Sequence, residues 1–514
     1  MATPALRGTS FAFPAILVFC LVAISSGLFT DFLYLQDLKR LDFQRILLCL
    51  VLAVFVPVHA ACALYYGVAP HRYSSLIWFF PVAVSFIGHY LYFDQYSYFP
   101  FEGMMFLSFF LVAGLNGNVL RESIGIVGAA TALVYAAMIC SAFYAALTLI
   151  KYTFILNDAI SPTNLIPWGF VNIRFWSHLA TWLLPLFPLA TLIGPFRNHN
   201  LWRWATALTA AVWWWVVIMS SAHGTMVALA ISFVFIAVFY RPVALEWLRV
   251  FSVYLLLGML LWVVLSVVLP SVLSQSEVKL SSDIASSTPI RMIMWKEAFA
   301  MSLVNFPFGM GGQAWLTHEP LTQPYITGSI RPFGAPHNMY LLWAAEYGWV
   351  SVLALGLPFS YAVIRLIKAR ASMSGAGVER NAVVIAVVAS VLAALMHSGV
   401  SSVLLTPAAA LAGLLVLSLF WGIILPEPST NAVSVKGDNA LKKEYRSLIK
   451  SRLFWAVVFA GSIWFGVTFM EEVFSYHEAM RANWECFPEQ TKLGPIPRFW
   501  QHGYYPNPLD YQCD

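Results

Sequence analysis

The chain has 514 residues, of which 60% are hydrophobic and only 10% are charged. Soluble domains are nearer half apolar and a quarter charged, so this composition excludes a water-soluble globular protein, a disordered chain and a disulfide scaffold. We attribute the net charge of +5 to basic loops that face anionic lipid, and not to a nucleic-acid-binding surface.

Long apolar runs without interior charge predict membrane-spanning helices, because about 20 residues are needed to cross a bilayer. We therefore expect an all-α polytopic membrane protein with about 12 to 13 transmembrane helices. The candidate runs lie near residues 11–29, 46–67, 74–93, 103–120, 123–150, 179–196, 202–219, 225–240, 247–272, 338–364, 381–405, 406–425 and 453–470.

The loops between these runs set the expected orientation and domain organisation. The basic cluster from Lys436 to Arg452 is the strongest signal for an inner loop, and it places the C-terminal tail outside. The expected divisions are an N-terminal transmembrane bundle (1–150), a catalytic transmembrane core (151–425) with a long periplasmic loop (273–336), a cytoplasmic basic loop (426–452), and a last span with a periplasmic tail (453–514).

Two of the six cysteines, Cys486 and Cys513, fall in the outer tail. A pair in an oxidising compartment is a candidate disulfide, and a short tail gains stability from such a link. Two unpaired thiols are the alternative.

Missing motifs narrow the chemistry. The sequence has no Asp-x-Asp, His-Glu-x-x-His or Cys-x-x-Cys pattern, so we expect no metal site. The run Gly309–Gly312 lacks the lysine and the following Ser or Thr of a phosphate loop, so we expect neither ATP hydrolysis nor a cofactor. Glu346 is the one acidic residue well inside a predicted span, which argues against an ion-coupled transporter.

Polar residues gather instead at the outer ends of the predicted spans. The group from Trp168 to His178 holds Arg174 among aromatic side chains, where a guanidinium either anchors at the headgroups or binds an anion. The group from Ser220 to Thr225 is a tight turn whose backbone amides and His223 are candidates for anion binding. A plain turn explains this second group equally well.

The long outer loop carries a predicted surface helix between Pro289 and the segment Asn305–Pro307. This helix has Arg291 in its first turn and Trp295 one turn later, so a cationic side chain is well placed for phosphate. His337 opens the next span on the outer side and is the best general-base candidate, because its intrinsic pKa lies near the working pH. A capping or loop histidine is the alternative interpretation.

The order of these clusters resembles the O-antigen ligase and polymerase superfamily, which also includes protein O-oligosaccharyltransferases. The resemblance covers roughly residues 168–425. The matching segments are Phe170–Arg174, Ser220–Gly224, Arg291 with Trp295 followed by Pro307–Gly311, His337–Asn338 with Tyr340, Glu346 with Gly348, and His397–Ser401 with Pro407.

The resemblance implies roles for individual residues. His337 is expected to be the catalytic residue that deprotonates or orients an acceptor hydroxyl, and Arg291 and Arg174 are expected to bind a diphosphate. His223 joins this diphosphate site, but it stands where the family commonly has an arginine, and a histidine is cationic only when its pKa is raised. The supporting residues are Asn338, Trp295 and Glu346.

The resemblance also implies the partners and the location. Family members take a glycan from an undecaprenyl diphosphate carrier and transfer it to a lipid A-core or glycan hydroxyl, on the periplasmic side of the bacterial inner membrane. A polymerase that extends lipid-linked repeats and an enzyme that glycosylates a protein serine share this donor. A lipid-linked glycan transporter is the alternative from another functional class.

Overall fold

The computed structural model describes residues 9–32, 40–66, 68–92, 99–157, 166–170, 173–272, 284–318, 320–322, 334–375, 377–426 and 438–486. Over these residues the chain is helical and contains no strand, which confirms the prediction of an all-α membrane protein. The longer helices are α1 (Thr9–Leu28), α2 (Arg40–Tyr66), α3 (Phe80–Tyr92), α4 (Phe99–Ser123), α5 (Gly125–Asn157), α6 (Ile173–Leu183), α8 (Asn200–Met219), α9 (His223–Phe239), α10 (Arg241–Trp262), α12 (Ile284–Val304), α14 (Met339–Ser372), α15 (Val378–Ser398), α16 (Pro407–Ile424) and α17 (Asp438–Cys486).

Ten helical stretches of the described residues are long and apolar enough to cross a membrane, fewer than the 12 to 13 predicted spans. The difference has a local explanation. The apolar parts of α1 and α9 are shorter, and α8 contains Arg203 and three consecutive tryptophans, which lower its mean hydropathy. The second half of α8 is buried in the bundle, so packing against protein replaces contact with lipid.

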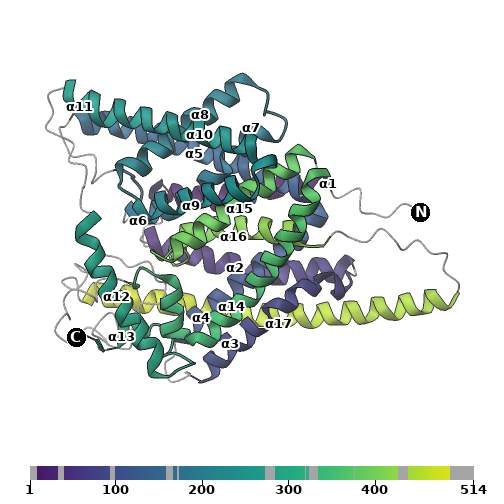
Figure 1. The fold of residues 1–514 in the computed structure, drawn as a ribbon. Helices are drawn as coiled ribbons and strands as arrows, with labels where there is room; N and C mark the ends of the chain where they lie inside the picture. The colour runs from purple at the N-terminus through teal and green to yellow at the C-terminus, as the bar shows by residue number, and fades with distance from the viewer. Residues whose placement is uncertain are drawn as a thin grey trace.

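The centre of the bundle is formed by α15 and α16 (Figure 1). Within their most apolar windows, 83% of α15 and 94% of α16 is buried, against 11% for α10 and its continuation to Val272. Both central helices are rich in alanine and other small residues, which allow close helix packing inside a membrane. They pack against α4, α6, α9 and α10, so the centre joins helices from widely separated parts of the sequence.

The predicted surface helix of the outer loop is α12, followed by the short helix α13 (Ala314–Thr317). In Figure 1 these helices lie at one end of the bundle, where α12 runs across the ends of the longer helices and packs against α14. The helix ends at Val304, immediately before Asn305–Pro307, as predicted. It begins at Ile284, so it includes Pro289 and is longer than the sequence suggested.

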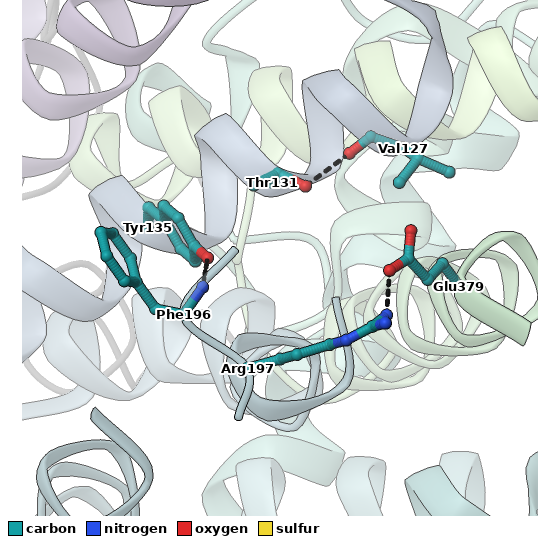
Figure 2. Close-up of polar contacts among 6 residues, drawn as sticks. All are labelled: Val127, Thr131, Tyr135, Phe196, Arg197 and Glu379. Atoms are coloured by element: carbon teal, nitrogen blue, oxygen red, sulfur yellow. Dashed lines mark hydrogen bonds and ion pairs between the residues drawn. The ribbon is translucent and has the colours of Figure 1, made fainter. Parts of the chain in front are cut away.

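The N-terminal end of α15 is fixed by the turn that precedes α8 (Figure 2). Arg197 in this turn forms an ion pair with Glu379 in the first turn of α15. The neighbouring amide of Phe196 donates to the hydroxyl of Tyr135 on α5 at 3.1 Å. This end of α15 therefore has a matched pair of charges and a hydrogen-bonded turn.

Candidate active site

The structure brings together two residues that lie far apart in the sequence, Arg174 and His337. Arg174 is in the first turn of α6, and its Nη1 lies 3.5 Å from Nε2 of His337. His337 has a positive φ of 55°, a strained conformation for a non-glycine residue that is common at functional sites. Asn338 follows as the N-cap of α14, and its side chain accepts a hydrogen bond from the Leu341 amide at 3.0 Å. Asn338 therefore supports the site by fixing the start of α14 next to the histidine.

Arg291 of α12 is the third member of this cluster. Partial burial and the positive charges of Arg174 and Arg291 together lower the pKa of His337 to about 3. Burial also lowers the pKa of Arg291, but a guanidinium still remains protonated at neutral pH. His337 is thus a neutral imidazole in contact with one guanidinium and within the electrostatic influence of a second, an arrangement suited to an anionic ligand.

Trp295 lies one turn after Arg291 on the same helix. Its indole Nε1 is buried and has no hydrogen-bond partner among the described residues. A buried N–H group without a partner is costly, and such groups are usually bonded to protein, water or ligand. Trp295 is therefore a candidate hydrogen-bond donor to a molecule bound beside Arg291.

Glu297, which the sequence reasoning did not select, holds the outer loop in place. Its side chain is buried, whereas that of the neighbouring Lys296 is exposed. Its carboxylate accepts hydrogen bonds from the amides of Leu321 at 2.6 Å and Thr322 at 2.9 Å. An acidic residue two positions after Trp295 in the predicted helix was the available signal.

The glycine run Gly309–Gly312 allows a close backbone approach, and its partner is the broken part of α14. Gly348 has a φ of 78° within α14, and a Cβ there would lie 2.2 Å from the Pro307 carbonyl oxygen. The Met310 amide donates to the Ala345 carbonyl at 2.9 Å, and the Gly311 amide donates to the Glu346 carbonyl at 2.9 Å. The loop is thereby attached to the helix that carries His337 at its start.

Glu346 has a supporting role in this attachment. The side chain is fully buried, and its carboxylate accepts a hydrogen bond at 3.1 Å from the Trp315 amide in α13. A carboxylate at a helix N-terminus also interacts favourably with the helix dipole. Glu346 therefore binds the loop from its side chain while its carbonyl binds Gly311.

His223 was predicted to join the diphosphate site. In the described part of the chain, its side chain forms no hydrogen bond or ion pair with the cluster. His223 is the first residue of α9, and its amide donates to Ser221 at 2.7 Å, so that amide is already used. The adjacent Gly224 packs directly on His397. The turn therefore reaches the site region through Gly224, and a diphosphate-binding role of His223 stays a prediction.

Two histidines beside the cluster form buried hydrogen bonds. The ring nitrogens of His178 lie 2.8 Å from the Thr406 hydroxyl and 2.6 Å from the Ser401 hydroxyl. Nδ1 of His397 lies 2.8 Å from the Thr181 hydroxyl. Sequence reasoning assigned no role to His178, because its partners are more than 200 residues away.

The predicted disulfide lies outside the described residues. Cys486 is the last residue of α17, where its side chain is not described, and Cys513 lies beyond it. The structure does change the expected start of the tail, since α17 continues past residue 470 to Cys486. Elsewhere in the described chain, no three His, Cys, Asp or Glu side chains gather as metal ligands would.

Comparison with known families agrees with the position of the cluster. Residues 207–356 match a family model described as O-antigen ligase, and this range includes Arg291, Trp295 and His337. This match supports the O-antigen ligase superfamily, and it covers less than a third of the chain. The match supports a glycosyltransferase-like membrane enzyme of the O-antigen ligase and polymerase type. Arg174 and His397 lie outside the matched range, and no curated protein matches the chain.

Proposed function

We propose that this O-antigen ligase family protein transfers an oligosaccharide from undecaprenyl diphosphate to a hydroxyl of lipid A-core, on the periplasmic side of the bacterial inner membrane. The observation that carries the proposal is the neutral His337 beside two guanidinium groups, at one end of a bundle of apolar helices. The acceptor, the carrier lipid and the membrane follow from the family resemblance.

In this reaction the acceptor oxygen forms a bond to the anomeric carbon while the bond from that carbon to the diphosphate oxygen breaks. His337 accepts the proton of the acceptor hydroxyl, as a neutral imidazole can. Arg174 and Arg291 bind the departing diphosphate and neutralise the charge that develops on it. The sugar is already activated by its phosphate ester linkage, so we propose that neither a metal ion nor ATP is required.

Donor binding also tunes the base. The charges of Arg174 and Arg291 contribute to the low pKa of His337 in the free protein. A bound diphosphate offsets these positive charges, so the pKa of His337 rises and the imidazole becomes a stronger base. His337 therefore becomes a stronger base only when the donor is bound. In the empty site its low pKa limits unproductive proton uptake.

The test is a reconstituted transfer assay with undecaprenyl diphosphate oligosaccharide and lipid A-core, in chelator and without ATP. We expect glycan-modified lipid A-core from the wild type and from Lys296→Ala, an exposed neighbour on α12. At equal protein levels we expect no product from His337→Ala and at least about 100-fold less product from Arg291→Ala. Normal product from both of these variants would contradict the proposed site.

The same assay separates the alternatives. A polymerase shares the family and the donor chemistry, and it would give longer carrier-linked glycan with unmodified lipid A-core. A protein glycosyltransferase would require a protein serine as the acceptor. Movement of labelled lipid-linked glycan across the membrane without covalent change would instead indicate a transporter.

A further inference from the structure

The last turn of α15 contacts three of the segments that carry candidate site residues. Next to His337, the Tyr340 hydroxyl donates to the Leu395 carbonyl at 2.8 Å. On α6, which carries Arg174, the Thr181 hydroxyl lies 2.8 Å from Nδ1 of His397. On α9, a Cβ added to Gly224 would lie 2.8 Å from Nε2 of His397, so a larger residue has no space there.

A series of hydroxyl groups continues from His397 to the backbone of Arg174. The Thr181 hydroxyl donates to the Ser177 carbonyl at 2.9 Å or to the Thr225 hydroxyl at 3.3 Å. The Thr225 hydroxyl also donates to the Ser177 carbonyl, at 3.2 Å, and the Ser177 hydroxyl donates to the Arg174 carbonyl at 2.8 Å. The first turns of α6 are therefore bonded to both α9 and α15.

We assign the proton of the His397 imidazole from this network. A threonine hydroxyl has one proton, and Thr181 directs its proton to Ser177 or Thr225. Thr181 then accepts from His397, which places the imidazole proton on Nδ1. Nε2 faces Gly224. The two ring nitrogens therefore differ: Nδ1 is hydrogen-bonded to Thr181, and Nε2 packs against Gly224.

The network is buried and polar inside an apolar bundle. His397 is 3% exposed, and Thr181 and Thr225 are fully buried. His178, also 3% exposed, packs edge-on against His397 with ring centroids 5.2 Å apart. Buried polar groups are costly unless they are satisfied, and a satisfied network fixes one arrangement of the elements that it joins.

We propose that His397 is a positioning residue, which holds the first turns of α6 through Thr181 and so places Arg174 beside His337. The inference rests on the proposed function, because Arg174 and His337 are assigned there to donor and acceptor. His397 acts through Thr181 and touches neither substrate. A displacement of about 1 Å at a reacting group can reduce the rate about 100-fold, so accurate placement matters.

Three substitutions separate positioning from packing. His397→Asn keeps an amide donor where Nδ1 lies, whereas His397→Gln moves the amide to the place of Nε2, and His397→Leu keeps only volume. Ser390→Ala is the matched control, because the Ser390 hydroxyl donates to the Trp182 carbonyl across the same pair of helices at 2.6 Å. We expect activity within about threefold of wild type for His397→Asn and Ser390→Ala, and losses of about 30- to 100-fold for the other two variants.

The kinetic readouts are kcat, KM for the donor, and the pH profile of the remaining activity. We expect His397→Leu to raise the donor KM and lower kcat, whereas His397→Asn retains the pH profile of the wild type. If His397→Asn altered the pH profile, His397 would take part in proton transfer, and the proposal would be overturned. Equal losses in His397→Leu and Ser390→Ala would overturn it as well, because general helix packing would then explain both.

A second measurement is independent of the reaction. Arg174→Cys provides a thiol whose alkylation rate reports the position of residue 174 in folded, detergent-solubilised protein. We expect His397→Leu to change this rate at least about fivefold, and His397→Asn and Ser390→Ala to leave it unchanged. An unchanged rate in His397→Leu overturns the positioning role. Failure of the wild type to transfer glycan, with the rate changed as expected, contradicts the proposed function alone.

Discussion

The two ends of α15 handle charge differently, although they belong to one helix of 21 residues. At the N-terminal end, Glu379 is paired with Arg197, and the adjoining turn is hydrogen-bonded to Tyr135 (Figure 2). At the other end, about 27 Å away, the helix is hydrogen-bonded to Tyr340 beside His337 and to Thr181 of the helix that carries Arg174. Arg291 forms no ion pair with any described residue.

The difference indicates what each end is for. A paired charge in a membrane protein stabilises the arrangement of helices on either side of it. Because the charge is already neutralised, no further ion needs to bind there. Cations that crowd a neutral histidine destabilise the empty protein, and a bound anion removes that cost. The end with His337 is therefore organised for a ligand, and the end with Glu379 is organised for packing.

Among the substitutions that test the difference between the two ends of α15, Arg291→Ala is expected to have the largest effect. We expect transfer efficiency to fall about 100- to 1,000-fold, because a preorganised cation at the developing diphosphate charge is lost. The thermal stability of the protein without donor should remain equal or rise, since one crowded cation is removed. Steady-state kinetics and thermal unfolding of the same preparation measure the two effects. A clear loss of stability without loss of transfer would show that Arg291 has a structural role, as Arg197 does. The two ends of α15 would then not differ in function.

Gly348→Ala should give the next largest effect. The new Cβ would lie 2.2 Å from the Pro307 carbonyl oxygen, at a backbone φ of 78°. We expect about 3 to 5 kcal/mol lower free energy of unfolding, with the loop bearing Arg291 detached from α14. Gly356→Ala is the matched control in the same helix, because nothing lies within 4 Å of its added Cβ. Denaturant unfolding in detergent compares the two variants, and equal stability would contradict the close approach.

Part of this organisation could be predicted from the sequence. Apolar runs located the helices, and Asn305–Pro307 marked the end of α12 because proline disfavours a continuing helix. The sequence also placed three site residues at the outer ends of predicted spans, which predicted that they share one end of the protein: Arg174, Arg291 and His337. The structure adds the 3.5 Å contact between Arg174 and His337.

The remaining features depend on contacts between distant segments. The bond from Trp315 to Glu346 and the bonds from His178 to the loop before α16 follow from how helices pack. Apolar periodicity reports which residues avoid water, but it does not report which buried polar groups meet. The sequence also gave α12 no start signal before Pro289, where no apolar pattern precedes the proline.

A pH experiment sharpens the comparison at the site. His337 must be neutral to accept a proton, and activity is lost as the pH falls through its pKa. Since that pKa is about 3 in the protein without donor, we expect kcat/KM for the donor, which reports the free enzyme, to show no decline from His337 between pH 8 and pH 5. Arg291→Gln removes one positive charge, so the pKa of His337 rises and the acidic decline moves to higher pH.

The measurement is the pH dependence of kcat/KM together with an NMR titration of labelled histidine in micelles. A wild-type decline centred near the ordinary histidine pKa of about 6.5 would show that the two arginines do not act on His337. The matched variant is Arg197→Gln, whose charge lies at the far end of α15 and should leave the profile unchanged.

The smallest effect is expected where the charges are paired. Both side chains of the Arg197 and Glu379 pair are about two-fifths exposed, at 41% and 40%, so solvent already screens their attraction. Arg197→Gln or Glu379→Gln should lower the free energy of unfolding by about 0 to 1 kcal/mol and leave transfer unchanged. The double variant should be no worse than either single variant, because the interaction is lost once. A large loss of transfer in any of the three would mean that this end of α15 also controls the site, and the division of roles along the helix would be wrong.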